Sequence, residues 1–321
     1  MKDIVVWAGH DENDALCQAL ARVPSARVLL AKDAAEARAL MPRADALILN
    51  NMRWNPDFAR VLASSPRLTW IQVLNAGFDN MERLGLPDRV VVSTIGGFAS
   101  TVVAEHAITL LLALVRHVPQ ALTAQHRAEW TRALAPTATV REMNVAVMGF
   151  GYIGKHVASL LAALGARPLV IASSERRDPS GMYVHALESL HGVLRESSAL
   201  VICAPLNDAT RKAVGQAAFA AMQPGSYLVN VSRGGIVDTD ALVAALESGS
   251  LAGAALDVID PEPLPPSHPL WRRPNVLLTP HVASSGTSEA ERVRLRNFLV
   301  ENVRRFVDGE EVLYLARIER N

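Results

Sequence analysis

Short apolar runs alternate with stretches of helical periodicity between residue 1 and about residue 99. The runs predict strands, and the amphipathic stretches between them predict helices. The predicted strands are Ile4–Trp7, Arg27–Leu30, Ala46–Leu49, Leu68–Val73 and Val90–Val92. The predicted helices are Asp14–Val23, Ala34–Leu40 and Pro56–Ala63. Such alternation is typical of a parallel sheet with helices on its faces.

A second alternation follows a long predicted helix, Ser100–Arg116, which we interpret as a bridge between two domains. Its helices include Lys212–Ala221 and Thr239–Ser248, and its strands are Val145–Met148, Pro168–Ala172, Leu200–Ala204, Tyr227–Val231, Ala252–Val258 and Val276–Thr279. The amphipathic stretch Thr287–Asp308, closed by Gly309, is expected to return to the first domain. We therefore predict an α/β protein of two Rossmann/flavodoxin-like, doubly wound parallel-sheet domains with an interdomain cleft. The domains would comprise residues 1–99 plus 286–321, and residues 100–285.

A glycine-rich turn follows the strand Val145–Met148 and leads directly into an apolar helical pattern. Gly149 would turn the chain sharply, Gly151 would let the backbone approach a pyrophosphate, and Gly154 would let helix and strand pack closely. A glycine-rich turn alone requires no ligand, but this strand and helix context favours nucleotide binding. The predicted phosphate-binding segment is Gly149, Phe150, Gly151, Tyr152, Ile153 and Gly154.

The end of the next predicted strand bears on which nicotinamide cofactor binds. An NAD-binding unit usually has an acidic residue here for the ribose hydroxyls, and this chain has Ala172. Hydroxyl and guanidinium donors suit a 2′-phosphate, which a carboxylate would repel. We therefore favour NADP(H); in the alternative, the arginines form a solvated turn and Glu175 serves NAD(H). The donors that follow Ala172 are Ser173, Ser174, Arg176 and Arg177.

Composition narrows the class of protein. The chain has 32 basic and 32 acidic residues, which argues against nucleic acid or an anionic membrane as the main partner. Cys17 and Cys203 are expected to be reduced core residues of a cytoplasmic protein, and neither a disulfide nor a metal site is expected. The chain begins with a strand pattern, so no signal peptide is expected, and the apolar run at 107–115 is too short to span a bilayer.

Three reactive side chains stand just past predicted strand ends in the second half: Arg233, Glu262 and His281. With the glycine-rich turn, the stretches around them closely resemble the D-isomer-specific 2-hydroxyacid dehydrogenases, of the glyoxylate/hydroxypyruvate reductase type. The resemblance covers nearly the whole chain. Other matching motifs are Asn75–Asn80, Val103–His106, Trp130, Ala204–Leu206 with Thr210, and His268–Trp271.

The chemistry of 2-keto acid reduction explains why such residues are needed. Hydride reaches the keto carbon while a proton reaches its oxygen, so the site requires a cation and an acid. The resemblance implies that Arg233 holds the carboxylate and keto oxygens, that His281 is the acid, and that Glu262 pairs with His281 and keeps the imidazolium form available. Each residue also has a structural interpretation: Arg233 as a strand cap, Glu262 as a solvated turn residue, and His281 as an interior histidine. The remaining histidines are interpreted as structural, with His106 on the bridging helix.

The resemblance also implies further contacts. The backbone of Asn75, Ala76 and Gly77 would bind the substrate carboxylate, with turn geometry as the alternative explanation for Gly77. Independently of the resemblance, the loop Asn50–Trp54 follows another predicted strand end, so its side chains could face the variable group of the substrate. Thr101 would contact the nicotinamide side, with N-capping as the alternative, and Asp257 would hold the nicotinamide amide. Other cofactor contacts implied by the resemblance are Ala204, Pro205, Thr210, Val231, Ser232 and His281.

The sequence thus predicts an oxidoreductase that reduces a small 2-keto acid, such as glyoxylate or hydroxypyruvate, to the D-2-hydroxy acid with NAD(P)H, NADPH being favoured. Residues 1–99 plus 286–321 would bind substrate and residues 100–285 the dinucleotide, with hinges near 100 and 285. The resemblance implies a homodimer. One alternative is a D-3-phosphoglycerate or other D-2-hydroxyacid dehydrogenase using NAD, and a formate enzyme is disfavoured because Glu262 is kept. A regulatory domain and partner-binding tails are not expected from the length of the chain, so an NADH-sensing corepressor is a lesser alternative.

Overall fold

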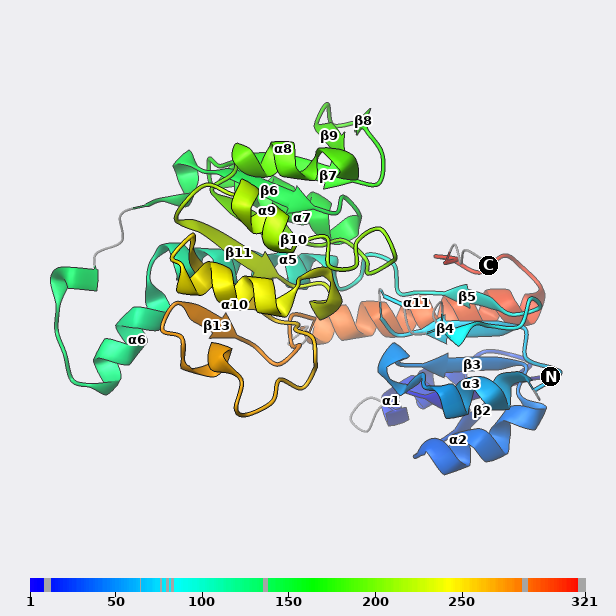
Figure 1. Ribbon diagram of the computed structural model, residues 1–321. Coiled ribbons are helices and arrows are strands. Elements are labelled where there is room, and N and C mark those ends of the chain that lie inside the picture. The colour runs from blue at the N-terminus through cyan, green and yellow to red at the C-terminus, as the bar shows by residue number, and fades with distance from the viewer. Residues whose placement is uncertain are drawn as a thin grey trace. The chain divides into compact units, whose positions relative to one another are not determined.

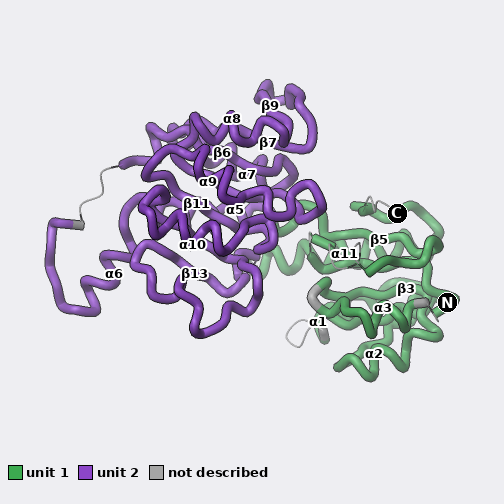
Figure 2. The backbone as a smooth tube through the Cα atoms, viewed as in Figure 1, with its two compact units in different colours: residues 1–99, 287–321 green, residues 100–286 purple. Residues whose placement is uncertain are grey.

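The computed structural model describes residues 1–8, 13–63, 65–75, 77–78, 81, 84–134, 138–284 and 288–316, and the observations below concern those residues (Figure 1). The chain divides into two compact units (Figure 2). Unit 1 comprises Met1–Ala99 and Thr287–Asn321, and unit 2 comprises Ser100–Gly286. Each unit is built on its own sheet.

Unit 1 has a five-stranded parallel sheet in the order β2-β1-β3-β4-β5, which is the flavodoxin-like order. Ile4 and Val6 face one side of the sheet and Val5 and Trp7 the other, because side chains alternate along a strand. Helices α1 and α11 cover the first side, and α2 and α3 cover the second. The elements are β1 (Lys2–Trp7), α1 (Asn13–Leu20), β2 (Ala26–Leu30), α2 (Ala34–Leu40), β3 (Ala46–Leu49), α3 (Pro56–Ala63), β4 (Trp70–Val73), β5 (Val91–Ser93) and α11 (Glu289–Asp308).

The helix α11 joins unit 1 from the far end of the chain. Its N-terminus has a capping box made by Ser288 and Glu291. In its last turns the fully buried Asn302 donates to Gln72 Oε1 on β4 at 2.8 Å and accepts from Leu313 N at 2.7 Å. A buried amide that satisfies partners from two other segments fixes the position of the helix along the sheet.

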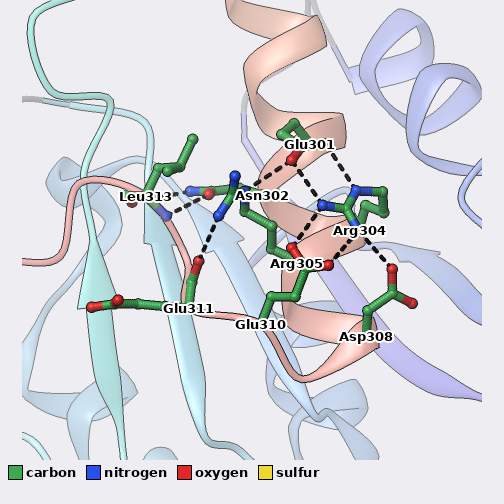
Figure 3. A network of polar contacts seen from close by, with 8 residues as sticks. All are labelled: Glu301, Asn302, Arg304, Arg305, Asp308, Glu310, Glu311 and Leu313. Carbon is green, nitrogen blue, oxygen red and sulfur yellow. Dashed lines mark hydrogen bonds and ion pairs between the residues drawn. The ribbon is translucent and has the colours of Figure 1, made fainter.

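An ion-pair network surrounds the end of α11 (Figure 3). Arg304 donates to Glu301, Asp308 and Glu310 at 2.8 to 3.0 Å. Arg305 also donates to Glu301, at 2.9 Å. The carboxylates hold the pKa of Arg304 above its ordinary value, and Arg304 in turn lowers the pKa of Glu301 to about 2. These contacts connect the helix end to the segment at 310–313 that follows it.

Unit 2 has an eight-stranded sheet in the order β13-β12-β11-β10-β6-β7-β9-β8. The order from β9 through β6 to β12 is that of the Rossmann fold. Every pair is parallel except β8 with β9, which is antiparallel. The strands are β6 (Asn144–Met148), β7 (Arg167–Ala172), β8 (Arg176–Arg177), β9 (Tyr183–Ala186), β10 (Ala199–Ile202), β11 (Ser226–Asn230), β12 (Leu251–Leu256) and β13 (Val276–Leu278).

Helices cover both faces of this second sheet. The side chains of α8, α9 and α10 form one continuous core with alternate residues of the strands. Helices α5 and α7 pack against each other and against the strands. The bounds are α5 (Ser100–Val115), α6 (Val118–His126), α7 (Tyr152–Ala163), α8 (Leu190–Arg195), α9 (Gln216–Ala221) and α10 (Thr239–Glu247).

Two local predictions differ from the structure of unit 2. The helix predicted from Lys212 begins at Gln216, because Val214 forms a parallel bridge with Val237 and Lys212 has φ of 51°. Arg176 and Arg177 form a strand rather than the solvated turn considered as the alternative.

In the described part of the chain, no single helix has both the length and the hydropathy needed to cross a membrane; α5 and α6 reach that threshold only together, with a bend of 64° between them.

Candidate active site

The candidate catalytic residues lie on loops that follow adjacent strands of unit 2. Strands β11, β12 and β13 are parallel neighbours, so their carboxyl ends meet at one edge of the sheet. Arg233 follows β11, Glu262 follows β12, and His281 follows β13. The fold therefore brings the three loops to one edge, as expected from the strand-end positions in the sequence.

His281 and Glu262 form a direct pair. The distance from His281 Nδ1 to Glu262 Oε1 is 2.8 Å, and about a third of each side chain is exposed. A carboxylate accepts hydrogen bonds only, so Nδ1 carries the proton in this pair and Nε2 is directed elsewhere. The pair therefore fixes both the ring orientation and the tautomer of His281.

The loop that carries His281 is held by Asp257. Asp257 is almost fully buried directly after β12, and its Oδ1 accepts from Thr279 Oγ1 at 2.6 Å and from Val282 N at 2.9 Å. Its Oδ2 accepts from Ala283 N at 3.0 Å. Asp257, predicted as a contact of the nicotinamide amide, thus uses both carboxylate oxygens on the loop at 279–283.

Arg233 lies in a turn that a buried asparagine shapes. Asn230, the last residue of β11, accepts from Ser232 N and donates to Arg233 O, both at 3.0 Å. The guanidinium of Arg233 donates to Ser232 O at 2.8 Å. The adjacent Gly234 lies so close to the next loop that an added Cβ would fall 2.0 Å from the carbonyl carbon of Ile259. The loops that carry Arg233 and Glu262 are therefore packed backbone to backbone.

The glycine-rich turn has the geometry that a dinucleotide pyrophosphate requires. A Cβ on Gly154 would fall 1.9 Å from Gly149 O, whereas a Cβ on Gly151 would meet nothing within 4 Å. Helix α7 starts at Tyr152, and its N-cap residue Gly151 provides no side-chain hydrogen bond to the first N–H groups. An open approach over Gly151 and uncapped N–H donors fit a phosphate group.

The loops after β10 and β11 lie beside this turn. A Cβ on Gly149 would fall 2.5 Å from Ala204 N, and the Ser232 hydroxyl donates to Ala204 O. The buried Thr210 closes the first loop by donating to Pro205 O at 2.7 Å. Of the remaining predicted cofactor residues, Val231 is buried and Thr101 is exposed in the first turn of α5.

The segment after β7 contains the predicted 2′-phosphate donors. Ser173, Ser174, Arg176 and Arg177 are all exposed, and Arg176 donates to Ser174 O at 3.0 Å. The carboxylate of Glu175 accepts from the Tyr183 hydroxyl, which raises the pKa of Tyr183. Lys155, in the first turns of α7, forms an ion pair with Asp178 at 2.9 Å. The carboxylate of Glu175 is thus hydrogen-bonded to a residue of β9, and the same segment also carries cationic side chains.

The predicted carboxylate-binding loop belongs to unit 1. Asn75 follows β4 and accepts from Asn51 N at 2.7 Å, so the loops after β3 and β4 are connected. Gly77 is half-buried, and Ala76 lies outside the described residues. Arg53, in the loop after β3, lies over the Trp7 ring at 5.0 Å.

Comparison with known proteins identifies the family. The family description that matches is "D-isomer specific 2-hydroxyacid dehydrogenase, NAD binding domain", over residues 108–283, which is more than half of the chain. The chain belongs to the D-isomer-specific 2-hydroxyacid dehydrogenases. It is therefore an NAD(P)-dependent oxidoreductase of the class that acts on small 2-hydroxy or 2-keto acids, and the predicted family, fold class and enzyme class are confirmed.

The dehydrogenase is similar to named proteins in sequence and in structure. It is 35% identical over 262 residues to a glyoxylate reductase from Aeropyrum pernix, which covers 78% of this chain and 76% of the relative. A D-isomer specific 2-hydroxyacid dehydrogenase from Xanthobacter autotrophicus, solved with NADPH and MES, has a TM-score of 0.83 at 30% identity and covers 98% of both chains. An NADPH-dependent glyoxylate/hydroxypyruvate reductase from Sinorhizobium meliloti, solved with NADP and sulfate, has a TM-score of 0.83 at 26% identity, again over 98% of both chains.

Sequence reasoning missed several residues that shape the dehydrogenase site. The sequence could have indicated a role for Asn230, because it is a polar residue at the end of an otherwise apolar strand. His106 and Thr279 were not detectable as a pair, since they lie 173 positions apart and meet only in the fold. The contact of Gly234 with Ile259 likewise depends on the neighbouring loop.

Proposed function

We propose that this dehydrogenase reduces glyoxylate or hydroxypyruvate to the corresponding D-2-hydroxy acid, with NADPH as the favoured cofactor. The observation that carries the proposal is the His281–Glu262 pair at 2.8 Å, on loops at the same sheet edge as Arg233. An oriented imidazole and a guanidinium on loops at one sheet edge provide the acid and the cation that keto-acid reduction requires. The names of the glyoxylate and hydroxypyruvate reductases among its relatives support this substrate class.

Each residue has a distinct role in the proposal. The nicotinamide, when bound, supplies the hydride that reaches the keto carbon. His281 donates a proton from Nε2 to the keto oxygen, while Glu262 accepts from Nδ1–H and stabilises the imidazolium. Arg233 binds the carboxylate and the keto oxygen through its guanidinium fork. The backbone N–H groups of 75–77 bind the carboxylate, and residues 1–99 with 286–321 and 100–285 act as the substrate-binding and dinucleotide-binding domains.

The preference for NADPH rests on the segment at 173–177. The Glu175 carboxylate is hydrogen-bonded to Tyr183, so it is not presented as a bare acceptor for ribose hydroxyls. The hydroxyls of Ser173 and Ser174 and the guanidinium groups of Arg176 and Arg177 are exposed on the same segment. Such donors suit a 2′-phosphate, which carries close to two negative charges. The structures of relatives solved with NADPH and NADP support the same preference.

The substrate class is tested by the oxidation of NADPH, followed through the absorbance of the reduced nicotinamide. We expect turnover with glyoxylate and hydroxypyruvate to exceed turnover with pyruvate by about tenfold in kcat/KM. The reverse reaction with 3-phosphoglycerate and NAD is the matched comparison. Faster turnover of 3-phosphoglycerate than of any keto acid would refute the proposal, and binding of NADPH without turnover of any acid would favour a sensor.

We also propose that the dehydrogenase is a homodimer. Val118 and Leu122 on α6 are 40% and 45% exposed, and Trp130 just after it is fully exposed. Large apolar side chains grouped on one surface segment suit burial against a second copy. We expect dimers in sedimentation velocity and a shift to monomers for the double variant Leu122→Glu, Trp130→Glu. Val293→Glu, at an apolar position of similar exposure on α11, should leave the dimer intact; a monomeric wild-type protein would contradict the proposal.

A further inference from the structure

The histidine on helix α5, the predicted bridging helix, contacts residues that hold the loop of His281. His106 lies on α5, and its Nε2 is 3.2 Å from Thr279 Oγ1 and 3.5 Å from Asp257 Oδ1. Its side chain is 23% exposed, and that of Asp257 is fully buried. The described contacts therefore form a chain from α5 through Thr279 to the carboxylate that holds the loop at 281–283.

The directions of these hydrogen bonds follow from the donors available. Thr279 has one hydroxyl proton, and at 2.6 Å it is donated to Asp257 Oδ1, which cannot donate when ionised. The oxygen of Thr279 must then accept from His106, so Nε2 of His106 carries a proton. The polarised hydroxyl strengthens its own bond to the carboxylate, because hydrogen bonds in a chain reinforce one another.

The carboxylate at the end of this chain controls the backbone next to His281. Asp257 accepts from Val282 N and Ala283 N, and its own carbonyl accepts from His281 N at 2.8 Å. His281 has φ of 56°, a left-handed conformation that is unfavourable for a residue with a Cβ. The surrounding hydrogen bonds must stabilise that conformation, which directs the imidazole to Glu262.

We propose that His106 is a positioning residue for His281, acting through Thr279 and Asp257. It donates from Nε2 to Thr279, which keeps the Asp257 carboxylate in the orientation that binds the 281–283 backbone. The inference rests on the acid role proposed above for His281, and it assigns His106 no contact with substrate. A side chain that keeps a donor at this position should preserve the loop, and one of similar size without a donor should not.

The experiment compares His106→Leu with His106→Gln, whose amide retains an N–H donor. For His106→Leu we expect kcat to fall about tenfold while KM for NADPH changes by less than about twofold. Hydrogen exchange of a peptide spanning 279–284, measured without cofactor, should be about fivefold faster, and a peptide across β11 should be unchanged. His106→Gln should recover most of both losses. His191→Leu, at an exposed histidine on α8, is the control and should behave as wild type.

The second test compares the single and double variants of His106 and Thr279. Thr279→Val should reproduce the effects of His106→Leu, and the double variant should lose little more than either single variant, since both interrupt one chain. Additive losses, an acceleration of exchange in the β11 peptide as large as that in the 279–284 peptide, or His106→Gln as impaired as His106→Leu would overturn the inference. Failure of the proposed function looks different: His281→Ala would then retain turnover, whereas an inactive His281→Ala with an unaltered loop in His106→Leu would overturn the positioning role alone.

Discussion

Replacing His281 with alanine is expected to lower kcat for keto-acid reduction about 1000-fold, within the range measured for loss of a general acid. The imidazole is held by Glu262 at 2.8 Å, whereas His268, on the described loop after β12, accepts a hydrogen bond from Leu270 N at 3.3 Å and has no described contact with Glu262. Since the side chain of His281 is about a third exposed, its removal creates no buried cavity, and folding should be preserved. Single-turnover kinetics with glyoxylate and NADPH provide the measurement.

The variant Glu262→Gln tests the charge of Glu262 separately from its role in orienting the imidazole of His281. The amide keeps the size of the side chain but removes the charge that stabilises the imidazolium, so we expect a kcat loss of about 100-fold, smaller than that of His281→Ala. Affinity for NADPH, measured by nicotinamide fluorescence, should stay close to wild type in both variants. The double variant should be no slower than His281→Ala. Turnover of His281→Ala within tenfold of wild type would exclude His281 as the acid.

Removing both arginines of β8 should reverse the cofactor preference. For the double variant Arg176→Ala, Arg177→Ala we expect the Kd for NADPH to rise about 100-fold while the Kd for NADH stays within about threefold. The reason is that only NADPH carries the 2′-phosphate that these guanidinium groups would bind. Isothermal titration of the protein with each cofactor measures the effect directly and does not depend on turnover.

The control for the cofactor experiment is Arg195→Ala, at an exposed arginine in the last turn of α8, which should leave both dissociation constants unchanged. High salt should weaken NADPH binding to the wild type more than to the double variant, because exposed charges are screened. A wild-type protein that binds NADH more tightly, with a preference that survives removal of both arginines, would show that Glu175 serves the ribose instead.

Much of the fold could be predicted because both sheets are built from apolar runs with polar breaks. The run Ala46–Leu49 is entirely buried and matches β3 at both ends. The hairpin of β8 and β9 was missed, since Arg176 and Arg177 are exposed on an edge strand and have no apolar pattern. The start of α9 was misplaced because a tertiary bridge at Val214 overrides local helix propensity.

The sequence could predict which strand ends carry the candidate site, but it could predict few of the contacts between the loops. A residue that follows a parallel strand lies at the carboxyl edge of the sheet. This rule alone places Arg233, Glu262 and His281 at one edge. It does not indicate that Asp257 binds the loop of His281 or that Gly234 must lack a Cβ, because both depend on atoms from neighbouring loops. The glycine-rich turn was recognisable because its constraint on the backbone is local.

The placement of α11 has a consequence for how the chain is made. Ile4, Val6 and Trp70 leave the ribosome early, but the side chains of Phe298, Leu299 and Val303 that cover them are synthesised only after all of unit 2. Until then, the part of this face of the first sheet that α11 covers stays exposed, while unit 2 can fold as a continuous segment. During that interval chaperone binding to residues 1–99 should be strongest, and it should end when Asn302 reaches Gln72.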